Sequence, residues 1–364
     1  MSVKPVDPAA APRKPEGAPA KPPVRNAAGR KHLALALQGG GAHGAFTWGV
    51  LDRILEDGRL EIEAITGTSA GAMNAVAFAD GLIENGRDGA RAKLERFWKA
   101  VSLDASMSPI QRSVADRLLG SWSLDNSPGY LLFDLFTRYA SPYEFNPLNI
   151  NPLKDILQKE IDFGRLRSDH HFHLFVAATN VTNGKVKVFP RQELTVEKVL
   201  ASACLPFLFQ AVEIDGVPYW DGGYMGNPVL WPLFYSCGGD DILIVQINPI
   251  ERRETPKTAM EIQNRLNEIT FNAALMGELR MIEFVTRQID RGRLSLERYK
   301  RLNMHRISGG AALDALNAST KLNAEREFLT YMRDLGREAT RAWLDAHFDD
   351  IGERSTFDLK TMIS

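Results

Sequence analysis

Residues 33–44 read LALALQGGGAHG, an apolar run of five residues followed by a loop that contains four glycines. A short apolar run bounded by glycine is typical of a strand buried on both faces of a parallel sheet. After the loop, apolar residues recur at helical spacing from Phe46 to Ile54, and this pattern ends at Gly58. The stretch therefore predicts a strand, a tight loop and a helix.

A second unit of the same kind follows at once. Residues 62–66 predict another buried strand, and the turn around Ser69 leads into a helix of small residues over about 70–79. Two such units in succession predict an α/β protein with three layers, in which helices cover both faces of a mainly parallel sheet. The other predicted strands are Phe172–Thr179, Lys185–Phe189, Val212–Ile214, Pro218–Trp220 and Ile242–Ile247.

Composition divides the chain into three parts. Residues 1–31 are rich in proline, alanine and basic residues, which predicts a disordered basic tail. Residues 32–250 form the predicted core, with an inserted cap at about 104–165 where aromatic residues, prolines and asparagines gather. Residues 251–364 are predicted to be a helical region packed on this core, with helical periods over 258–287 and 319–347.

Bulk properties exclude several classes of protein. The net charge of −1 gives no overall attraction to nucleic acid, and no apolar stretch is long enough to span a bilayer. Cys204 and Cys237 do not form a disulfide framework. We therefore expect a cytoplasmic protein that either is free or lies peripherally on the inner membrane surface. The basic stretch Arg287–Arg306 and the N-terminal tail are the candidate membrane contacts.

The turn Gly67-Thr68-Ser69-Ala70-Gly71 fits the pattern G-x-S-x-G between a strand and a helix. Small neighbours at Gly67 and Gly71 are needed because the turn is strained and packs closely. The start of a helix also stabilises the negative charge that develops in acyl transfer. Ser69 is therefore the candidate nucleophile.

The glycine loop allows two interpretations. Gly39, Gly41 and Gly44 match the dinucleotide-binding pattern, for which Glu61 or Glu63 could supply the acidic residue. Alternatively, the amides of residues 39–41 could form an oxyanion hole. Because adjacent parallel strands bring their following loops to the same sheet edge, the nearby Ser69 turn favours the oxyanion hole.

A third signal is Asp221, which follows a short predicted strand and precedes Gly222 and Gly223. An aspartate before two glycines is often only a turn. The three motifs in this order resemble those of the patatin-like phospholipase family, as does the run Ala201–Phe207 ahead of Asp221. The resemblance covers about residues 33–249. This resemblance implies Ser69 as nucleophile, Asp221 as proton acceptor and Gly39, Gly40 and Gly41 as the oxyanion hole.

The resemblance also implies that the substrate is a lipid acyl ester, such as a phospholipid or lysophospholipid, and that no cofactor or metal is needed. The family usually has Arg or Lys where this chain has His43, which leaves the charge at the loop open. A Ser-His-Asp triad is the rival mechanism, and His43, His305 and His347 are the histidines considered for it. His170, His171 and His173 cluster without further ligands, so no metal site is expected.

Other functions remain open at this stage. The protein could hydrolyse a polyester or an acyl thioester, bind nucleotide, or regulate without catalysis. The aromatic segment Tyr130–Tyr139 could line an acyl site as part of the cap, or it could be a packed core helix.

Overall fold

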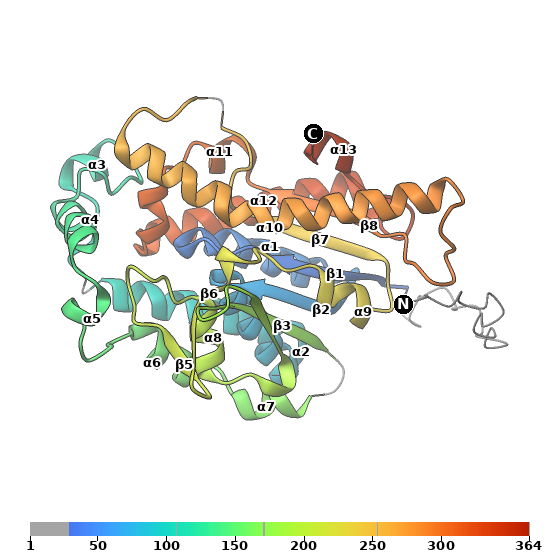
Figure 1. Ribbon diagram of the computed structural model, residues 1–364, viewed down its shortest axis with the longest axis horizontal. Helices are drawn as coiled ribbons and strands as arrows, with labels where there is room; N and C mark the ends of the chain where they lie inside the picture. Colours follow the sequence, from blue (N-terminus) through green and yellow to red (C-terminus); the bar gives the residue numbers. More distant parts are fainter. Residues whose placement is uncertain (1–28, 107, 170–171, 253, 364) are drawn as a thin grey trace, which may run out of the picture.

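The computed structural model describes residues 29–106, 108–169, 172–252 and 254–363, and its centre is an eight-stranded sheet (Figure 1). The strand order is β5-β6-β3-β2-β1-β7-β8, and β4 pairs with β3 outside this path. The strands are β1 (Lys31–Leu37), β2 (Leu60–Thr68), β3 (His173–Asn180), β4 (Val186–Pro190), β5 (Val212–Ile214), β6 (Val217–Asp221), β7 (Asp241–Gln246) and β8 (Asn303–Ser308).

Parallel pairing joins β3, β2, β1, β7 and β8, whereas β4, β5 and β6 pair in antiparallel fashion. All seven strands predicted from the sequence are present, and the mainly parallel α/β fold is confirmed. Strand β8 was not predicted, because it carries His305 and Arg306 within a basic stretch. His305 is buried there and its Nε2 lies 2.9 Å from Oδ1 of Asp241, so the polar ring is satisfied inside the sheet.

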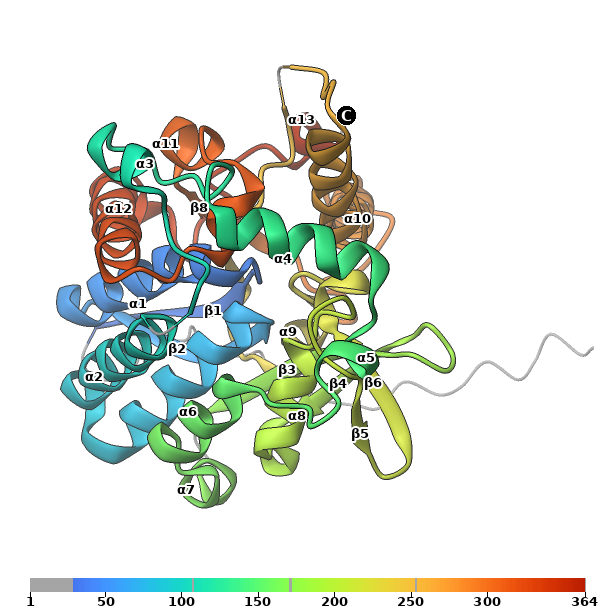
Figure 2. The same ribbon diagram turned by 90° about the vertical axis from the view of Figure 1, so that its left-hand side faces the viewer.

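Helices form layers on both faces of the sheet (Figure 2). The α-helices are α1 (Gly44–Asp57), α2 (Ala70–Ala105), α3 (Val114–Leu118), α4 (Pro128–Tyr139), α5 (Pro142–Phe145), α6 (Pro152–Glu160), α7 (Phe163–Ser168), α8 (Val196–Ser202), α9 (Trp231–Ser236), α10 (Ala259–Asp290), α11 (Gly310–Asp314), α12 (Arg326–His347) and α13 (Leu359–Ile363). The 3₁₀ turns are η1 (Gly41–His43), η2 (Arg191–Glu193), η3 (Gly222–Tyr224), η4 (Ala318–Leu322) and η5 (Phe348–Asp350).

Strand β1 separates two hydrophobic cores. Leu33, Leu35 and Leu37 belong to the larger core, which also contains the buried residues of α1, α2 and α12. Ala34 and Ala36 point to the opposite face, where the second core includes residues of α9 and α10. This alternation along one strand confirms the three-layer arrangement, because successive side chains of a strand face opposite sides of the sheet.

Helix α2 is much longer than the helix of about ten residues that the small side chains predict. It continues to Ala105, with a break in helical geometry at Asn85 and Gly86. Its first half packs on the sheet, and Trp98 in its second half donates from Nε1 to Asn74 at 3.0 Å. The small-residue pattern therefore marks only the part of the helix that lies against the sheet.

The predicted insert contains α3, α4 and α5 at the edge of the sheet where β1 and β2 end. Helix α4 crosses this edge from the side of α12 toward the side of α10 (Figure 2). Tyr130 of α4 is buried, whereas Leu132 and Leu135 are exposed. The aromatic segment is therefore a helix with one buried side over the edge of the sheet, and it is not a core helix.

Candidate active site

Ser69 occupies the turn between β2 and α2 in a strained backbone conformation, with φ 54° and ψ −124°. Only a few per cent of residues other than glycine have a positive φ, and such strain is found at functional turns. The Ser69 amide donates to Oγ of Ser202 at 2.9 Å, which fixes the turn. A Cβ at Gly71 would lie 2.2 Å from the carbonyl oxygen of Leu37, so only glycine fits there.

The glycine loop lies beside Ser69 because β1 and β2 are parallel neighbours, with Leu37 paired to Gly67. The Gly39 amide already donates to Oδ1 of Asn227 at 2.6 Å. The amides of Gly40 and Gly41 donate no hydrogen bond within the described part of the chain. Of the three predicted oxyanion-hole residues, Gly40 and Gly41 therefore have amides that can serve a ligand in this structure.

Asp221 arrives at the same edge on the antiparallel strand β6. Thr68 pairs with Ala177 of β3, and Asp221 pairs with the next residue, Ala178, so the aspartate reaches the level of the Ser69 turn across β3. The Gly223 amide donates to Oδ1 of Asp221 at 2.7 Å. The glycines after Asp221 are needed for packing, because a Cβ at Gly222 would lie 2.2 Å from the Ala177 carbonyl oxygen.

Burial shifts the pKa of the Asp221 carboxyl group. The residue is 0% exposed, and this burial raises the pKa of its carboxyl group to about 7, although the Gly223 amide and the Ser69 hydroxyl lower it. Its Oδ2 has no hydrogen-bond partner among the described residues, and the nearby Ser69 hydroxyl lies outside regular hydrogen-bond geometry. A buried acceptor without a donor is available to a proton from Ser69.

His43 is buried at the end of η1 and does not line the pocket that contains Ser69. Its Nε2 is 2.7 Å from Oγ1 of Thr320, and its ring packs against Phe328. Burial holds the pKa of His43 well below its usual range, and the positive charges of Lys321 and Arg252 lower it further. The ring is therefore neutral and contributes no positive charge to the loop.

The other candidate histidines lie elsewhere. His305 is buried in β8 beside Asp241, and His347 contacts Asp350 at the end of α12. His173 begins β3, while His170 and His171 lie outside the described residues. Within the described chain, no group of three or more His, Cys, Asp or Glu side chains could hold a metal ion.

The acidic residues considered for dinucleotide binding lie away from the glycine loop. Glu61 and Glu63 are near the start of β2, where they pair with Arg30 and His32 at 3.0 and 2.7 Å. A ribose-binding carboxylate would have to be near the carboxyl end of the strand, beside the loop. The geometry therefore does not support the dinucleotide interpretation.

One pocket collects the predicted residues from distant parts of the sequence. Ser69, Asp221, Gly40 and Gly41 line its floor. The walls are formed by Tyr130, Asp134, Leu205, Phe207, Leu208, Tyr224, Asn248, Gln263, Asn264, Asn267, Phe271, Ala318, Lys321 and Leu322. The pocket is thus bounded by α4, α10, η4 and the segment that follows α8.

Sequence reasoning missed four supporting residues. Ser202 holds the Ser69 amide, and Asn227 holds the Gly39 amide. Asn248 donates from Nδ2 to the Gly39 carbonyl oxygen at 2.6 Å, and Lys321 donates to Oδ1 of Asn248 at 2.8 Å. Ser202 lies within the run Ala201–Phe207, and Asn227 follows Asp221 and its two glycines, so these motifs could have indicated both residues. Lys321 has no such signal, because it reaches the pocket only through tertiary packing.

The strained serine turn at the edge of a mainly parallel sheet, beside free glycine amides and a buried aspartate, defines a class of α/β hydrolytic proteins. The chain belongs to the patatin-like phospholipase family, whose family model matches residues 35–234. Membership makes the protein an enzyme, a hydrolase of lipid acyl esters.

Two solved structures of bacterial proteins are similar to this chain. VipD from Legionella pneumophila is 17% identical with a TM-score of 0.43, and the match covers 89% of this chain and 69% of VipD. ExoU, in its complex with SpcU from the type III secretion system of Pseudomonas aeruginosa, is 19% identical with a TM-score of 0.32. That match covers 91% of this chain and 61% of the ExoU chain. No curated protein sequence matches significantly.

Among the described residues, no helix combines the length and the apolar character that crossing a membrane requires.

Proposed function

We propose that the protein hydrolyses lipid acyl esters through a dyad of Ser69 and Asp221. The observation that carries this proposal is the Asp221 carboxyl group, which is fully buried beside the Ser69 turn with its pKa raised to about 7. An ordinary aspartate is a poor base at neutral pH, whereas a group with a pKa near 7 is well matched to proton transfer. This shift answers the main chemical objection to a dyad without histidine.

The first half-reaction transfers the acyl group to Ser69. Asp221 takes the hydroxyl proton as Oγ attacks the ester carbonyl carbon, and the amides of Gly40 and Gly41 receive the oxyanion. The positive end of α2, which begins at Ala70, also faces this charge. The intermediate collapses as the C–O bond to the alcohol breaks, and Asp221 returns its proton to the leaving oxygen.

Water completes the cycle by the same route. Asp221 takes one proton from water, whose oxygen attacks the acyl carbon of the ester at Ser69. Collapse releases the carboxylic acid, and the proton returns to Oγ of Ser69. Besides the ester and water, this scheme uses only groups of the chain.

Three variants test the dyad on p-nitrophenyl butyrate and on a panel of lipid esters that includes an acyl thioester. Ser69→Ala and Asp221→Asn should each abolish hydrolysis, while His43→Ala should only reduce it. Complete loss of activity in a folded His43→Ala protein would favour a triad. Activity on the thioester alone would instead support the alternative substrate class.

We propose further that α4 turns the pocket toward a lipid surface. Tyr130 lines the pocket, and Leu132, Leu135 and Phe136 on the same helix are 68%, 54% and 50% exposed. A cluster of exposed apolar side chains at the mouth of a lipid hydrolase is suited to an apolar interface.

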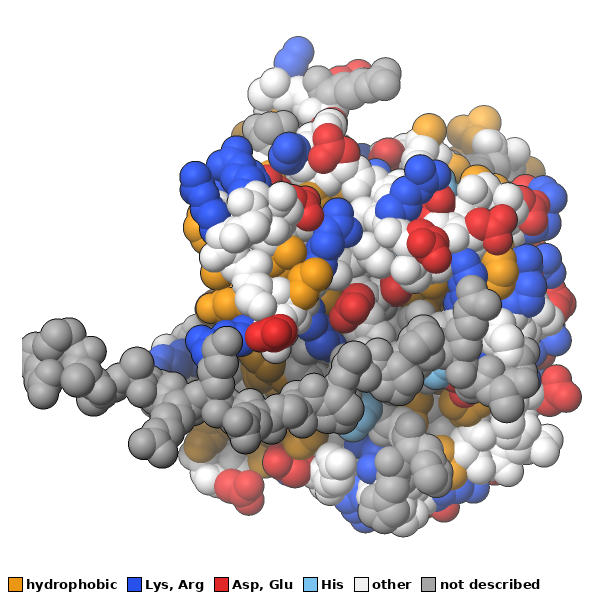
Figure 3. Space-filling model, turned by 90° about the vertical axis from the view of Figure 1, so that its right-hand side faces the viewer, with side chains coloured by type: hydrophobic (Ala, Val, Ile, Leu, Met, Phe, Trp, Pro, Cys, Tyr) orange, Lys and Arg blue, Asp and Glu red, His pale blue; other side chains and the backbone are white. Residues whose placement is uncertain are grey.

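The basic stretch Arg287–Arg306 lies on a different side of the molecule. Helix α10 contributes Gln263 and Phe271 to the pocket and then runs to Asp290, toward the edge where β1 begins (Figure 1). On that side, basic side chains are mixed with acidic ones (Figure 3), and Arg301 pairs with Asp290 at 3.0 Å. Docking through this stretch would turn the pocket away from the lipid. The N-terminal tail, through residue 28, lies outside the described residues.

A further inference from the structure

Lys321 is the only lysine or arginine among the described residues that line the pocket. Its Nζ donates to Oδ1 of Asn248 at 2.8 Å and forms no ion pair with a described carboxylate. The nearby Glu268 is already paired with Arg252 at 2.6 Å and with Arg265 at 3.1 Å. Because an ammonium group has three donors, Lys321 has two left for a ligand.

The position of Lys321 is fixed by its surroundings. Its carbonyl oxygen lies where a Cβ on Gly41 would clash, so η4 packs directly on the oxyanion loop. Asn317 donates from Nδ2 to Oγ of Ser123 at 2.9 Å. The Leu124 amide donates to Oγ of Ser319 at 3.1 Å. These two hydrogen bonds join η4 to the segment before α4.

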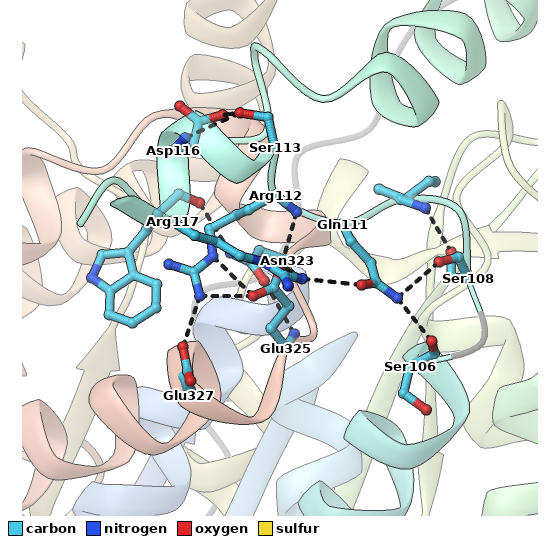
Figure 4. Close-up of polar contacts among 12 residues, drawn as sticks. Ser106, Ser108, Gln111, Arg112, Ser113, Asp116, Arg117, Asn323, Glu325 and Glu327 are labelled. Carbon is cyan, nitrogen blue, oxygen red and sulfur yellow. Dashed lines mark hydrogen bonds and ion pairs between the residues drawn. The ribbon is translucent and has the colours of Figure 1, made fainter. Parts of the chain in front are cut away.

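A cluster of ion pairs joins Arg112, at the beginning of the segment before α4, to residues that follow η4 (Figure 4). The Arg112 guanidinium bridges Glu325 at 2.7 Å and Glu327 at 2.9 Å, and it stacks on the ring of Trp122. Asn323 donates to the Trp122 carbonyl oxygen at 3.0 Å. These contacts hold the backbone around Lys321, and the hydrogen bond to Asn248 orients its Nζ before any ligand arrives, which lowers the entropic cost of binding.

Two segments that line the pocket differ in chemistry. Helix α10 contributes the amide side chains of Gln263, Asn264 and Asn267, which make no hydrogen bond within the described residues. The segment after α8 contributes apolar side chains instead, namely Leu205, Phe207 and Leu208. One wall therefore suits a polar headgroup, and the other suits an acyl chain.

We propose that Lys321 binds the phosphodiester of a glycerophospholipid whose acyl ester lies at Ser69. This inference rests on the proposed hydrolase function and adds to it a residue that would bind the headgroup. A phosphodiester carries a single negative charge and can pair with Lys321, which forms no ion pair with a described carboxylate. Lysine is also a frequent phosphate ligand. A neutral acylglycerol would leave the partly buried ammonium without a counter-charge, which is unfavourable.

The kinetic test compares phosphatidylcholine with diacylglycerol of the same chains in detergent micelles, with p-nitrophenyl butyrate as a third substrate. Lys321→Met should lower kcat/KM for phosphatidylcholine about tenfold or more, mainly through KM. Activity on the two substrates without phosphate should change by less than about twofold. Lys321→Arg should retain most of the phospholipid activity, and Lys154→Met on the exposed side of α6 is the matched control.

Equal losses on all three substrates would overturn the proposal, because they would indicate a role in ester chemistry or in folding. Unchanged phospholipid activity would also overturn it. Circular dichroism and thermal melting check the fold of each variant.

A binding measurement keeps the inference separate from catalysis. In the Ser69→Ala background, Lys321→Met should weaken lysophosphatidylcholine binding about tenfold and leave monoacylglycerol binding unchanged. Equal affinities for lysophosphatidylcholine with and without Lys321→Met would contradict the phosphate contact. If the wild type binds these lipids as expected but cleaves none of the three esters, the proposed function fails while the Lys321 site stands.

Discussion

The Gly39 amide donates a 2.6 Å hydrogen bond to Oδ1 of Asn227, and Nδ2 of Asn227 donates back to the Gly39 carbonyl oxygen at 3.3 Å. This reciprocal pair joins the glycine loop after β1 to the segment that follows Asp221. The Gln38 side chain donates to the Asn227 carbonyl oxygen at 3.0 Å and strengthens the same link. The loop is therefore oriented by a residue outside it, with the next two amides left free.

Asn227→Ala should lower kcat about 10- to 100-fold and change KM little, because the freed loop no longer holds its amides toward the oxyanion. Steady-state kinetics on p-nitrophenyl butyrate measures both parameters. Asn183→Ala, in the exposed turn between β3 and β4, is the matched control. A rise in KM at unchanged kcat would mean that Asn227 acts on substrate binding instead.

The pH dependence of hydrolysis reports the base. Since Asp221 must be ionised to accept the Ser69 proton, log kcat/KM should rise with unit slope up to about pH 7 and level off above it. Burial also raises the pKa of Glu278 to about 7, but this residue binds the amides of Leu230 and Trp231 outside the pocket. The limb near pH 7 should therefore persist in Glu278→Gln. A limb near pH 4 would show that the base has an ordinary carboxyl pKa.

The same shift predicts a cost in stability. The folded state binds the Asp221 proton more tightly than the unfolded chain, whose pKa is about 3.9, so the wild type loses stability as the pH rises from about 4 to 7. Asp221→Asn lacks this loss. Urea unfolding should show that the advantage of the variant over the wild type grows by about 3 kcal/mol between pH 5 and pH 8. A constant difference across this range would contradict the raised pKa.

The exposed side of α4 should determine activity on membranes. Leu132→Ser combined with Leu135→Ser removes about 3 kcal/mol of apolar transfer energy, so binding to phospholipid vesicles should fall more than tenfold. Hydrolysis of monomeric p-nitrophenyl butyrate should stay within about twofold. Leu296→Ser, also exposed but within the basic stretch, serves as the control. Vesicle flotation measures binding, and a larger effect of Leu296→Ser would place the contact on the basic stretch.

Much of the fold could be predicted because local patterns agree with it. The alternation of Leu and Ala in residues 33–37 matches the two cores on either side of β1. Strand β8 could not be predicted in this way, because His305 is polar and only its tertiary partner, Asp241, makes its burial favourable. The sequence also suggests helix from Ser319, yet η4 and a connecting loop precede α12, which begins at Arg326.

The floor of the pocket follows from sequence order, whereas its walls do not. Ser69 and the glycine loop meet because their strands are parallel neighbours, which the two successive strand–loop–helix units predict. Asp221 arrives on an antiparallel strand, which no sequence pattern specified. Lys321 lies 100 residues after Asp221 and reaches the loop only because η4 packs against Gly41. Long-range packing of this kind leaves no periodic signal in the chain.

Labelling with a fluorophosphonate tests the central claim most directly, since the reagent reacts with an activated serine and does not depend on which lipid is the substrate. The account predicts one adduct per chain, mapped by peptide mass spectrometry to Ser69, absent in Ser69→Ala and formed much more slowly in Asp221→Asn. An adduct on another residue, or undiminished labelling of Ser69→Ala, would contradict it.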